Sequence, residues 1–148
     1  MLLRTCRSIK KNDCGYLIHG DAADVLLVFM SDDVIRIRVH FDRTKPMEEE
    51  SYTLVTTAWP DRMDELLAGE RTRIQALDVP MEENEKEAVF CTKTLRLVLN
   101  KKPFSFSLYT AEGELIYQDL RERAFERDQL GRLTHYSKTD RGLDHFYG

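Results

Sequence analysis

Residues that could carry chemistry are present in this sequence, but they are scattered along it. The histidines stand singly, and the cysteines form no CxxC pair. Zinc sites use several such ligands at short, recognisable spacings. The sequence therefore predicts neither a metal site nor a bound cofactor. The residues concerned are His19, His40, His135, His145, Cys6, Cys14 and Cys91.

The motifs of common catalytic sites are also absent. The sequence has no glycine-rich phosphate loop, no GxSxG nucleophile motif and no HExxH metal motif. Its carboxylates are numerous, but on an acidic surface such groups mostly contact solvent. From the residues alone we predict a domain that binds a partner or supports a structure, with no catalytic residue.

Composition narrows the range of partners. Of the 148 residues, 42% are hydrophobic and 32% charged, which is typical of a folded globular domain. A net charge of -4 supplies no basic excess for phosphates, so we predict no nucleic-acid partner. No stretch approaches the ~20 apolar residues of a membrane span, so we predict no membrane partner. The odd number of cysteines leaves one disulfide open, but reduced thiols in the cytoplasm are the simpler interpretation.

Alternating hydrophobicity marks the strands that would position a site. The segment "DVIRIRVHF" at 33–41 alternates with a period of two, whereas "ADVLLVFM" at 23–30 is apolar almost throughout. A turn composition, "SDD", lies between them. These features predict a hairpin whose first strand is the more deeply buried.

A second group of strands is predicted between residues 95 and 119. The segments "NKKP" and "AEGE" divide this region as turns, and Gly113 is expected to supply a positive φ. The result is an antiparallel meander of three short strands, with a further strand expected within 131–138. Four residues are predicted to share one core: Ile37, Val39, Leu97 and Phe106.

The middle of the chain is less regular. Strands are predicted at 51–59 and 71–79, with a short helix at 60–70, where a proline precedes a short apolar stripe. Taken together, the elements predict one domain over 1–148. Its expected fold is mainly all-β, an antiparallel β-sandwich with one or two short helices.

The segment "LRERAFERDQLG" at 120–131 has two interpretations. A loop of this length in a β domain often covers a ligand or docks a neighbour. Alternatively, its arginines and glutamates lie at helical spacing, which favours a short surface helix. Both interpretations stay open from the residues alone.

The order of motifs in 97–148 resembles the N-terminal domain of glycoside hydrolase family 31, the α-glucosidase and α-xylosidase family. The similarity runs from "LVLNKKPFSFSLYTAEGELIYQD" through a variable loop to "GLDHFYG". In that family a strand carries PF, a turn follows, an acid ends the next strand, and an hfYG segment comes later. The matching parts here are Pro103-Phe104, Glu112-Gly113, Asp119 and residues 145–148.

This resemblance implies a β-sandwich of the galactose-mutarotase-like superfold, packed on a (β/α)8 catalytic barrel. Members of the family hydrolyse α-linked glucosides with retention, through two carboxylates on that barrel. We therefore expect a domain cut from a longer enzyme just before the barrel and inactive alone. Its expected partners are the barrel and an α-glucoside oligosaccharide at the rim of the sugar pocket.

The resemblance also implies roles for individual residues. Asp119 matches by position an acid that contacts sugar hydroxyls, and Arg123 and Asp128 are further substrate-binding candidates on the loop after it. A carboxylate suits this task because it accepts hydrogen bonds from neighbouring hydroxyls. The alternative for Asp119 is a strand-end residue that caps the next segment. Contacts with the barrel are expected from Leu143, Phe146 and Tyr147, which could otherwise mediate a homo-oligomer.

Two other functions stay open at this point. A free-standing carbohydrate-binding module would display a row of exposed aromatic residues, but Trp59 is the only tryptophan and the tyrosines do not align on one strand. A structural interaction module would bind a partner without affinity for sugar. A titration with maltose and isomaltose, followed by NMR, would separate these two functions.

Overall fold

The computed structural model describes residues 1–12, 15–44 and 76–138. These residues form strands and turns, with no helix long and apolar enough to cross a membrane. The predicted helix at 60–70 and strand at 51–59 lie outside the described residues. The strands are β1 (Cys6–Asn12), β2 (Gly15–Gly20), β3 (Asp24–Phe29), β4 (Ile35–His40), β5 (Met81–Glu83), β6 (Glu87–Cys91), β7 (Leu95–Lys101), β8 (Phe104–Thr110), β9 (Leu115–Asp119), β10 (Phe125–Arg127), β11 (Leu133–His135) and β12 (Ser137–Lys138).

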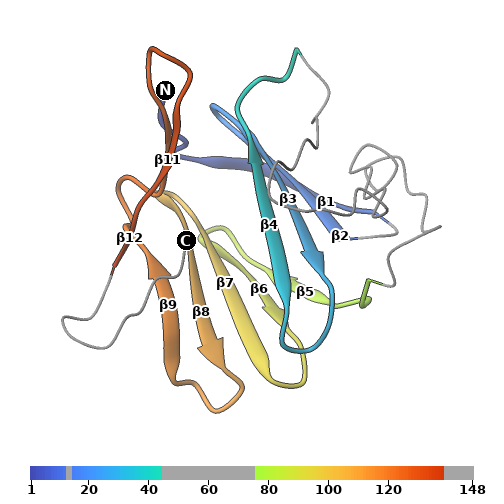
Figure 1. The fold of residues 1–148 in the computed structure, drawn as a ribbon. Helices are drawn as coiled ribbons and strands as arrows, with labels where there is room; N and C mark the ends of the chain where they lie inside the picture. Colours follow the sequence, from blue (N-terminus) through green and yellow to red (C-terminus); the bar gives the residue numbers. More distant parts are fainter. Residues whose placement is uncertain (13–14, 45–75, 139–148) are drawn as a thin grey trace, which may run out of the picture.

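Two antiparallel sheets build the domain (Figure 1). One has four strands in the order β1-β2-β3-β4, and the other has six in the order β12-β9-β8-β7-β6-β5. The apolar faces of the two sheets pack on each other, which confirms the predicted β-sandwich.

The predicted β3–β4 hairpin is confirmed, with Leu27 opposite Ile37. Residues of β3 after Asp24 are buried, whereas β4 is only partly buried along its length. This difference follows from position, because β3 lies inside its sheet and β4 is the last strand in the described order. The predicted meander is confirmed as β7, β8 and β9, with Gly113 at a φ of 95° in the second turn.

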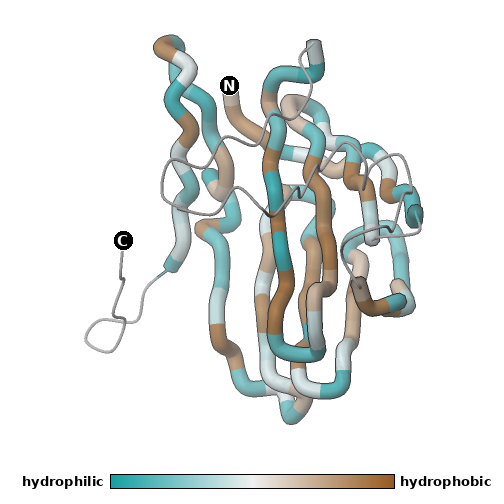
Figure 2. The backbone as a smooth tube through the Cα atoms, turned by 45° about the vertical axis from the view of Figure 1, so that its right-hand side comes forward, coloured by the Kyte–Doolittle hydropathy of each residue, from teal (hydrophilic) through white to brown (hydrophobic). Residues whose placement is uncertain are grey.

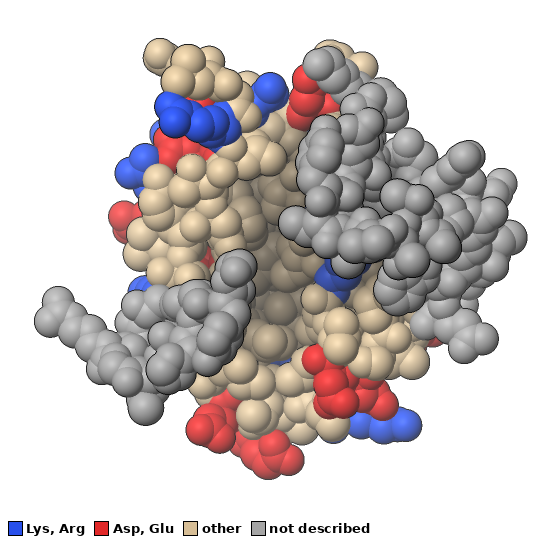
Figure 3. Space-filling view, viewed as in Figure 1, with Lys and Arg blue, Asp and Glu red and all other residues tan. Residues whose placement is uncertain are grey.

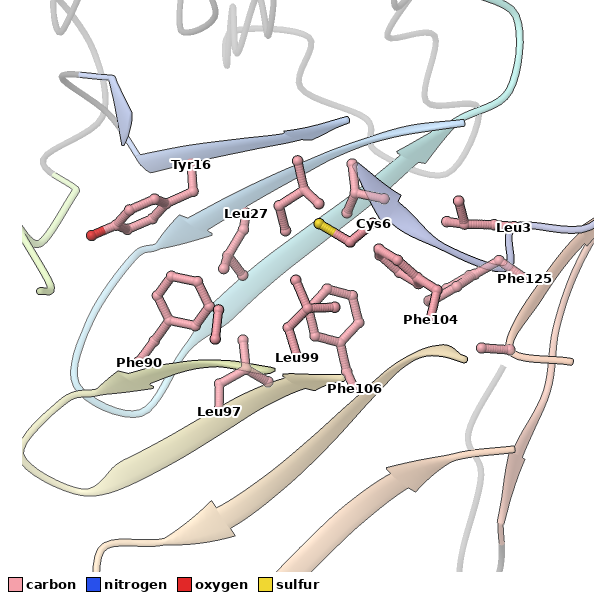
Figure 4. Close-up of a cluster of buried hydrophobic side chains, with 14 of the residues drawn as sticks. Leu3, Cys6, Tyr16, Leu27, Phe90, Leu97, Leu99, Phe104, Phe106 and Phe125 are labelled. Carbon is pink, nitrogen blue, oxygen red and sulfur yellow. The ribbon is translucent and has the colours of Figure 1, made fainter. Parts of the chain in front are cut away.

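The core lies between the sheets and is rich in aromatic rings (Figure 4). Tyr16 of β2 meets Phe90 of β6 edge-on, with ring centroids 4.9 Å apart. Of the four predicted core residues, Leu97 and Phe106 are fully buried. Ile37 and Val39 are partly buried and pack against the same cluster, because they lie on β4.

Hydrogen bonds between turns close one end of the sandwich. The backbone carbonyl of Asp32, in the β3–β4 turn, accepts bonds of 2.7 Å from the hydroxyls of Thr92 and Thr94. These threonines lie in the β6–β7 turn of the other sheet. The two sheets are therefore joined at this end by polar contacts as well as by the core.

A β-hairpin of β10 and β11 projects from the opposite end (Figure 1). The first residues of the chain pair with it: Leu3 N–H donates to the Phe125 carbonyl at 3.1 Å, and Arg127 N–H donates to the Met1 carbonyl at 2.8 Å. Figure 2 shows hydrophobic residues along this hairpin and at its tip. The first residues of the chain thus pair with β10 through an isolated antiparallel bridge between Leu2 and Glu126.

The hairpin corrects the helix interpretation of residues 120–131. Residues 121–124 form turns and bends with Ala124 buried against the core, and the chain then runs extended through β10, so docking of a neighbour by this segment stays a prediction. Gly131 has a φ of 82°, which allows the tight reversal between the strands. The strand predicted within 131–138 is confirmed as β11 and β12.

Replacing Phe106 with alanine should destabilise the domain by ~3–5 kcal/mol, since it empties the space of a ring packed against Phe104 at 5.5 Å. Urea unfolding, monitored by tryptophan fluorescence or circular dichroism, measures this decrease in the free energy of unfolding. A variant with an unchanged unfolding midpoint would show that the side chain is not part of the packed core.

Candidate functional site

Asp119 is the centre of a polar cluster at the base of the hairpin. It ends β9, and only 1% of the residue is exposed. Its Oδ2 accepts a hydrogen bond of 2.7 Å from the backbone N–H of Phe106 on β8. Its Oδ1 accepts bonds from the Tyr117 hydroxyl and, at 2.8 Å, from Nε2 of His135.

The strand geometry explains why these groups meet. Tyr117 and Asp119 are two residues apart on β9 and therefore point to the same face of the sheet. β12 follows β11 after one residue and pairs Ser137 with Asp119, which brings His135 alongside. The Tyr117 hydroxyl also lies 2.7 Å from Nε2 of His135, so the three polar groups form a triangle.

The network determines how the imidazole of His135 carries its protons. A carboxylate only accepts hydrogen bonds, so Nε2 must donate to Asp119. The ring stacks on Phe125, with centroids 4.5 Å apart and planes within 4°. Its side chain is 47% exposed, so a fixed imidazole is presented at the surface.

Tyr117 is held in its neutral form. Burial raises the pKa of its phenol. The carboxylate of Asp119 raises this pKa further, because it accepts a hydrogen bond from the hydroxyl and would repel a phenolate. The hydroxyl therefore remains a donor over the physiological pH range.

Arg123 lies near the same base but faces solvent. Its Nη2 lies 2.6 Å from the carboxylate of Glu126, and its guanidinium lies over the ring of Tyr136 at 4.7 Å. Tyr136 is the chain neighbour of His135. Asp119 thus contacts His135, and Arg123 contacts the next residue, Tyr136.

Asp128 is placed at the other end of the hairpin, in its turn. It accepts hydrogen bonds from the backbone N–H groups of Leu130 and Arg132, both at 2.8 Å, and pairs with the Arg132 guanidinium at 3.0 Å. This side chain stabilises the reversal between β10 and β11. The structure therefore places Asp119 and Arg123 at the base of the hairpin without a direct contact between them, one against His135 and the other against Tyr136, and it places Asp128 at the turn.

The burial of Asp119 bears on its expected role. Both carboxylate oxygens are engaged within the domain, so a direct sugar contact would require one of these bonds to break. The alternative interpretation, a cap for the next segment, is incomplete, because the donors come from β8, β9 and β11. Leu143, Phe146 and Tyr147 lie outside the described residues.

Tyr117 and His135 escaped the sequence analysis. The only available signal for His135 was its place in an alternating segment that follows an acid at a strand end. Among the described residues, no group of three or more His, Cys, Asp and Glu side chains could hold a metal ion. Within the same residues Cys6 is buried and Cys91 exposed, each as a free thiol.

The face seen in Figure 3 is hollowed at its centre, between the hairpin and the position of β4 in Figure 1. Uncharged atoms line the visible part of the hollow, while lysine, arginine and acidic side chains lie around its edge. Four residues of β4 and β8 beside the core are only partly buried: Ile35, Ile37, Val39 and Leu108. Apolar side chains from both sheets are therefore only partly covered beside the core.

Comparison with protein families identifies the domain. Residues 24–148 match the model of the glycosyl hydrolase 31 N-terminal galactose mutarotase-like domain. The chain belongs to this family. The match includes both strands of the β3–β4 hairpin, the meander and the hairpin of β10 and β11. A comparison with curated proteins found no match.

Two solved structures share the fold. A dextranase of glycoside hydrolase family 31 from Flavobacterium johnsoniae, complexed with isomaltotriose, is 18% identical with a TM-score of 0.64. The similarity covers 87% of this chain and 14% of the dextranase chain. A cycloalternan-forming enzyme from Listeria monocytogenes, in complex with a pentasaccharide substrate, is 13% identical with a TM-score of 0.54, over 84% of this chain and 10% of the enzyme.

Replacing Asp119 with alanine should destabilise the domain, because the buried N–H of Phe106 loses its acceptor. An orphaned buried donor costs about 1–3 kcal/mol. Urea unfolding measures this change, and Glu122→Ala is the matched control, since Glu122 is exposed in the same segment. The control should change stability by less than about 0.5 kcal/mol. Equal stability of the two variants would contradict a structural role for the Asp119 carboxylate.

Tyr117 should make stability depend on pH in the alkaline range. The unfolded chain ionises its tyrosines near pH ~10, whereas the raised pKa keeps Tyr117 neutral in the folded state. The contribution of Tyr117 is therefore complete below that pH and decreases as the pH rises. Urea unfolding of the parent and of Tyr117→Phe should show a stability difference that is constant up to pH ~9 and smaller above ~10. A difference that grows with pH would contradict the raised pKa.

Proposed function

We propose that this β-sandwich packs against the catalytic (β/α)8 barrel of a retaining α-glycosidase and extends its hairpin to the rim of the sugar pocket. The family match over residues 24–148 carries the proposal. Within such an enzyme the domain supplies no catalytic group. The nucleophile and the general acid/base would both be carboxylates of the barrel.

The hairpin is the proposed contact with the barrel. It projects from the sandwich and carries leucines that are poorly covered: Leu130 is 75% exposed and Leu133 is 61% exposed. Leu133 lies on the same face of β11 as His135, beyond the point where Phe125 meets the core. Apolar residues grouped on a projection are typical of a surface that a partner covers. Leu143, Phe146 and Tyr147 are proposed to contribute to the same interface.

An α-linked glucose oligosaccharide is the proposed substrate of the enzyme. The dextranase carries isomaltotriose and the cycloalternan-forming enzyme a pentasaccharide, and this chain shares the fold of their corresponding domains. Arg123 is an exposed hydrogen-bond donor near the base of the hairpin, and Asp128 an exposed acceptor at its turn. We propose that these groups reach the pocket rim, while Asp119 fixes the base of the hairpin from within.

The reading frame that continues past Gly148 offers a decisive first test. It should encode a (β/α)8 barrel with two carboxylates at the ends of its strands. The chain alone should release no p-nitrophenol from p-nitrophenyl α-glucoside. The barrel, expressed separately, should bind the chain, and Leu130→Asp with Leu133→Asp should weaken that binding.

Thr134→Asp provides the matched control, because Thr134 is also exposed on β11 but lies on the other face of the hairpin. It should leave the affinity for the barrel close to that of the parent chain. If Thr134→Asp reduced the affinity for the barrel as much as Leu130→Asp with Leu133→Asp does, the leucine face would not be the interface. A reading frame without a barrel, or hydrolysis by the chain itself, would overturn the proposed function.

A further inference from the structure

Only one of the two ring nitrogens of His135, Nε2, forms hydrogen bonds with the described residues. Nε2 donates to the carboxylate of Asp119 and lies next to the Tyr117 hydroxyl. No group of the described residues forms a hydrogen bond with Nδ1. In the neutral ring the proton resides on Nε2, so Nδ1 carries a lone pair and acts as an acceptor.

The ring is also held in orientation. Phe125 covers one of its faces in a parallel stack, and Phe125 is anchored in the core beside Phe104 and Phe106. The carboxylate that holds Nε2 is in turn fixed by the backbone of Phe106. The buried carboxylate of Asp119 thus orients the half-exposed imidazole of His135. Proteins commonly hold an imidazole in this way at a ligand-binding site.

We propose that His135 is the sugar-contacting residue of this cluster and that Asp119 and Tyr117 are positioning residues. Nδ1 accepts a hydrogen bond from a hydroxyl of an α-glucoside. The choice of ligand class rests on the proposed function, whereas the assignment of Nδ1 as the acceptor rests on the hydrogen-bond geometry.

The surroundings of the ring suit a polyhydroxylated ligand. Sugar hydroxyls are both donors and acceptors, so they need both kinds of group in the protein. Nδ1 supplies an acceptor, and the exposed guanidinium of Arg123, held over the neighbouring Tyr136, supplies donors on the other side of the same short segment. Asp119 itself is too deeply buried to take this role.

Two substitutions distinguish a sugar contact at Nδ1 from the structural bond between Nε2 and Asp119. They do so because glutamine and asparagine place their amides at different distances from the backbone. In His135→Gln the amide reaches the position of Nε2 and can still donate to Asp119, but the acceptor at Nδ1 is lost. In His135→Asn the amide lies near the position of Nδ1, but it cannot reach Asp119. The ring is half exposed, so both variants should fold, which circular dichroism verifies.

The first measurement is the tautomer of His135 in the full chain. Nitrogen-15 NMR, at a pH where the titration of the ring itself shows it to be neutral, should find the proton on Nε2. Asp119→Asn offers an amide that can donate as well as accept, so the preference for Nε2–H should weaken in that variant. A neutral ring protonated on Nδ1 in the parent chain would overturn the assignment.

The second measurement is a titration with isomaltotriose up to about 100 mM, a range that detects even millimolar sites. The Nδ1 resonance of His135 should shift on binding, and His135→Gln should weaken binding roughly 2- to 10-fold, the value of one hydrogen bond. If His135 were only structural, His135→Gln would bind like the parent chain while His135→Asn would not. No shift of His135 by isomaltotriose, or equal binding by parent and His135→Gln, would overturn the proposal.

These outcomes are distinct from those that test the proposed function. A chain that binds the separate barrel but shows no response of His135 to sugar would keep the proposed function and reject the new site. A chain without a barrel in its reading frame, but with the expected response of Nδ1, would keep the site and reject the wider function.

Discussion

A carboxylate removed from water must be met by hydrogen-bond donors, and the burial of Asp119 imposes this constraint on the end of the sandwich that carries the hairpin. The donors come from three strands: a backbone N–H of β8, the Tyr117 hydroxyl of β9 and the imidazole of β11. Each donor fixes one strand relative to the other two. This junction, together with the β12–β9 pairing and the bonds to the first residues of the chain, sets the direction in which the β10–β11 hairpin leaves the sheet.

The two ends of the sandwich are built differently. At the β3–β4 turn, short bonds from Thr92 and Thr94 to the carbonyl of Asp32 join the sheets directly. At the opposite end, the joining is indirect and passes through the hairpin and the first residues of the chain. The partly buried residues of β4 and the hollow of Figure 3 lie on the open side of this arrangement. The two ends of the sandwich are thus joined by different kinds of contact.

How much could be predicted from the sequence depended on burial. The β3–β4 hairpin and the meander were predictable because each strand buries one face or both, so its apolar residues show a clear pattern. β1 and β5 show no such pattern, since β1 is largely exposed and β5 is only three residues long. The charges of 120–131 favoured a helix, but the burial of Phe125 outweighs local propensity. Asp119 could be selected by its place at a strand end. Its partner His135 could not, because the register that joins residues 16 positions apart is set by tertiary packing.

The pairing of Met1 with Arg127 joins residues 126 positions apart and has a consequence for the order of folding. During synthesis the first residues leave the ribosome without the strand that they pair with, since β10 is made much later. The four-stranded sheet and the meander are formed by contacts between neighbours in sequence and can assemble before that. The bonds between the first residues and β10 can therefore form only after β10 has been made, and they close a long loop at a high entropic cost. The surface that we propose as the contact with the barrel therefore takes its final form only when both ends of the described chain have come together.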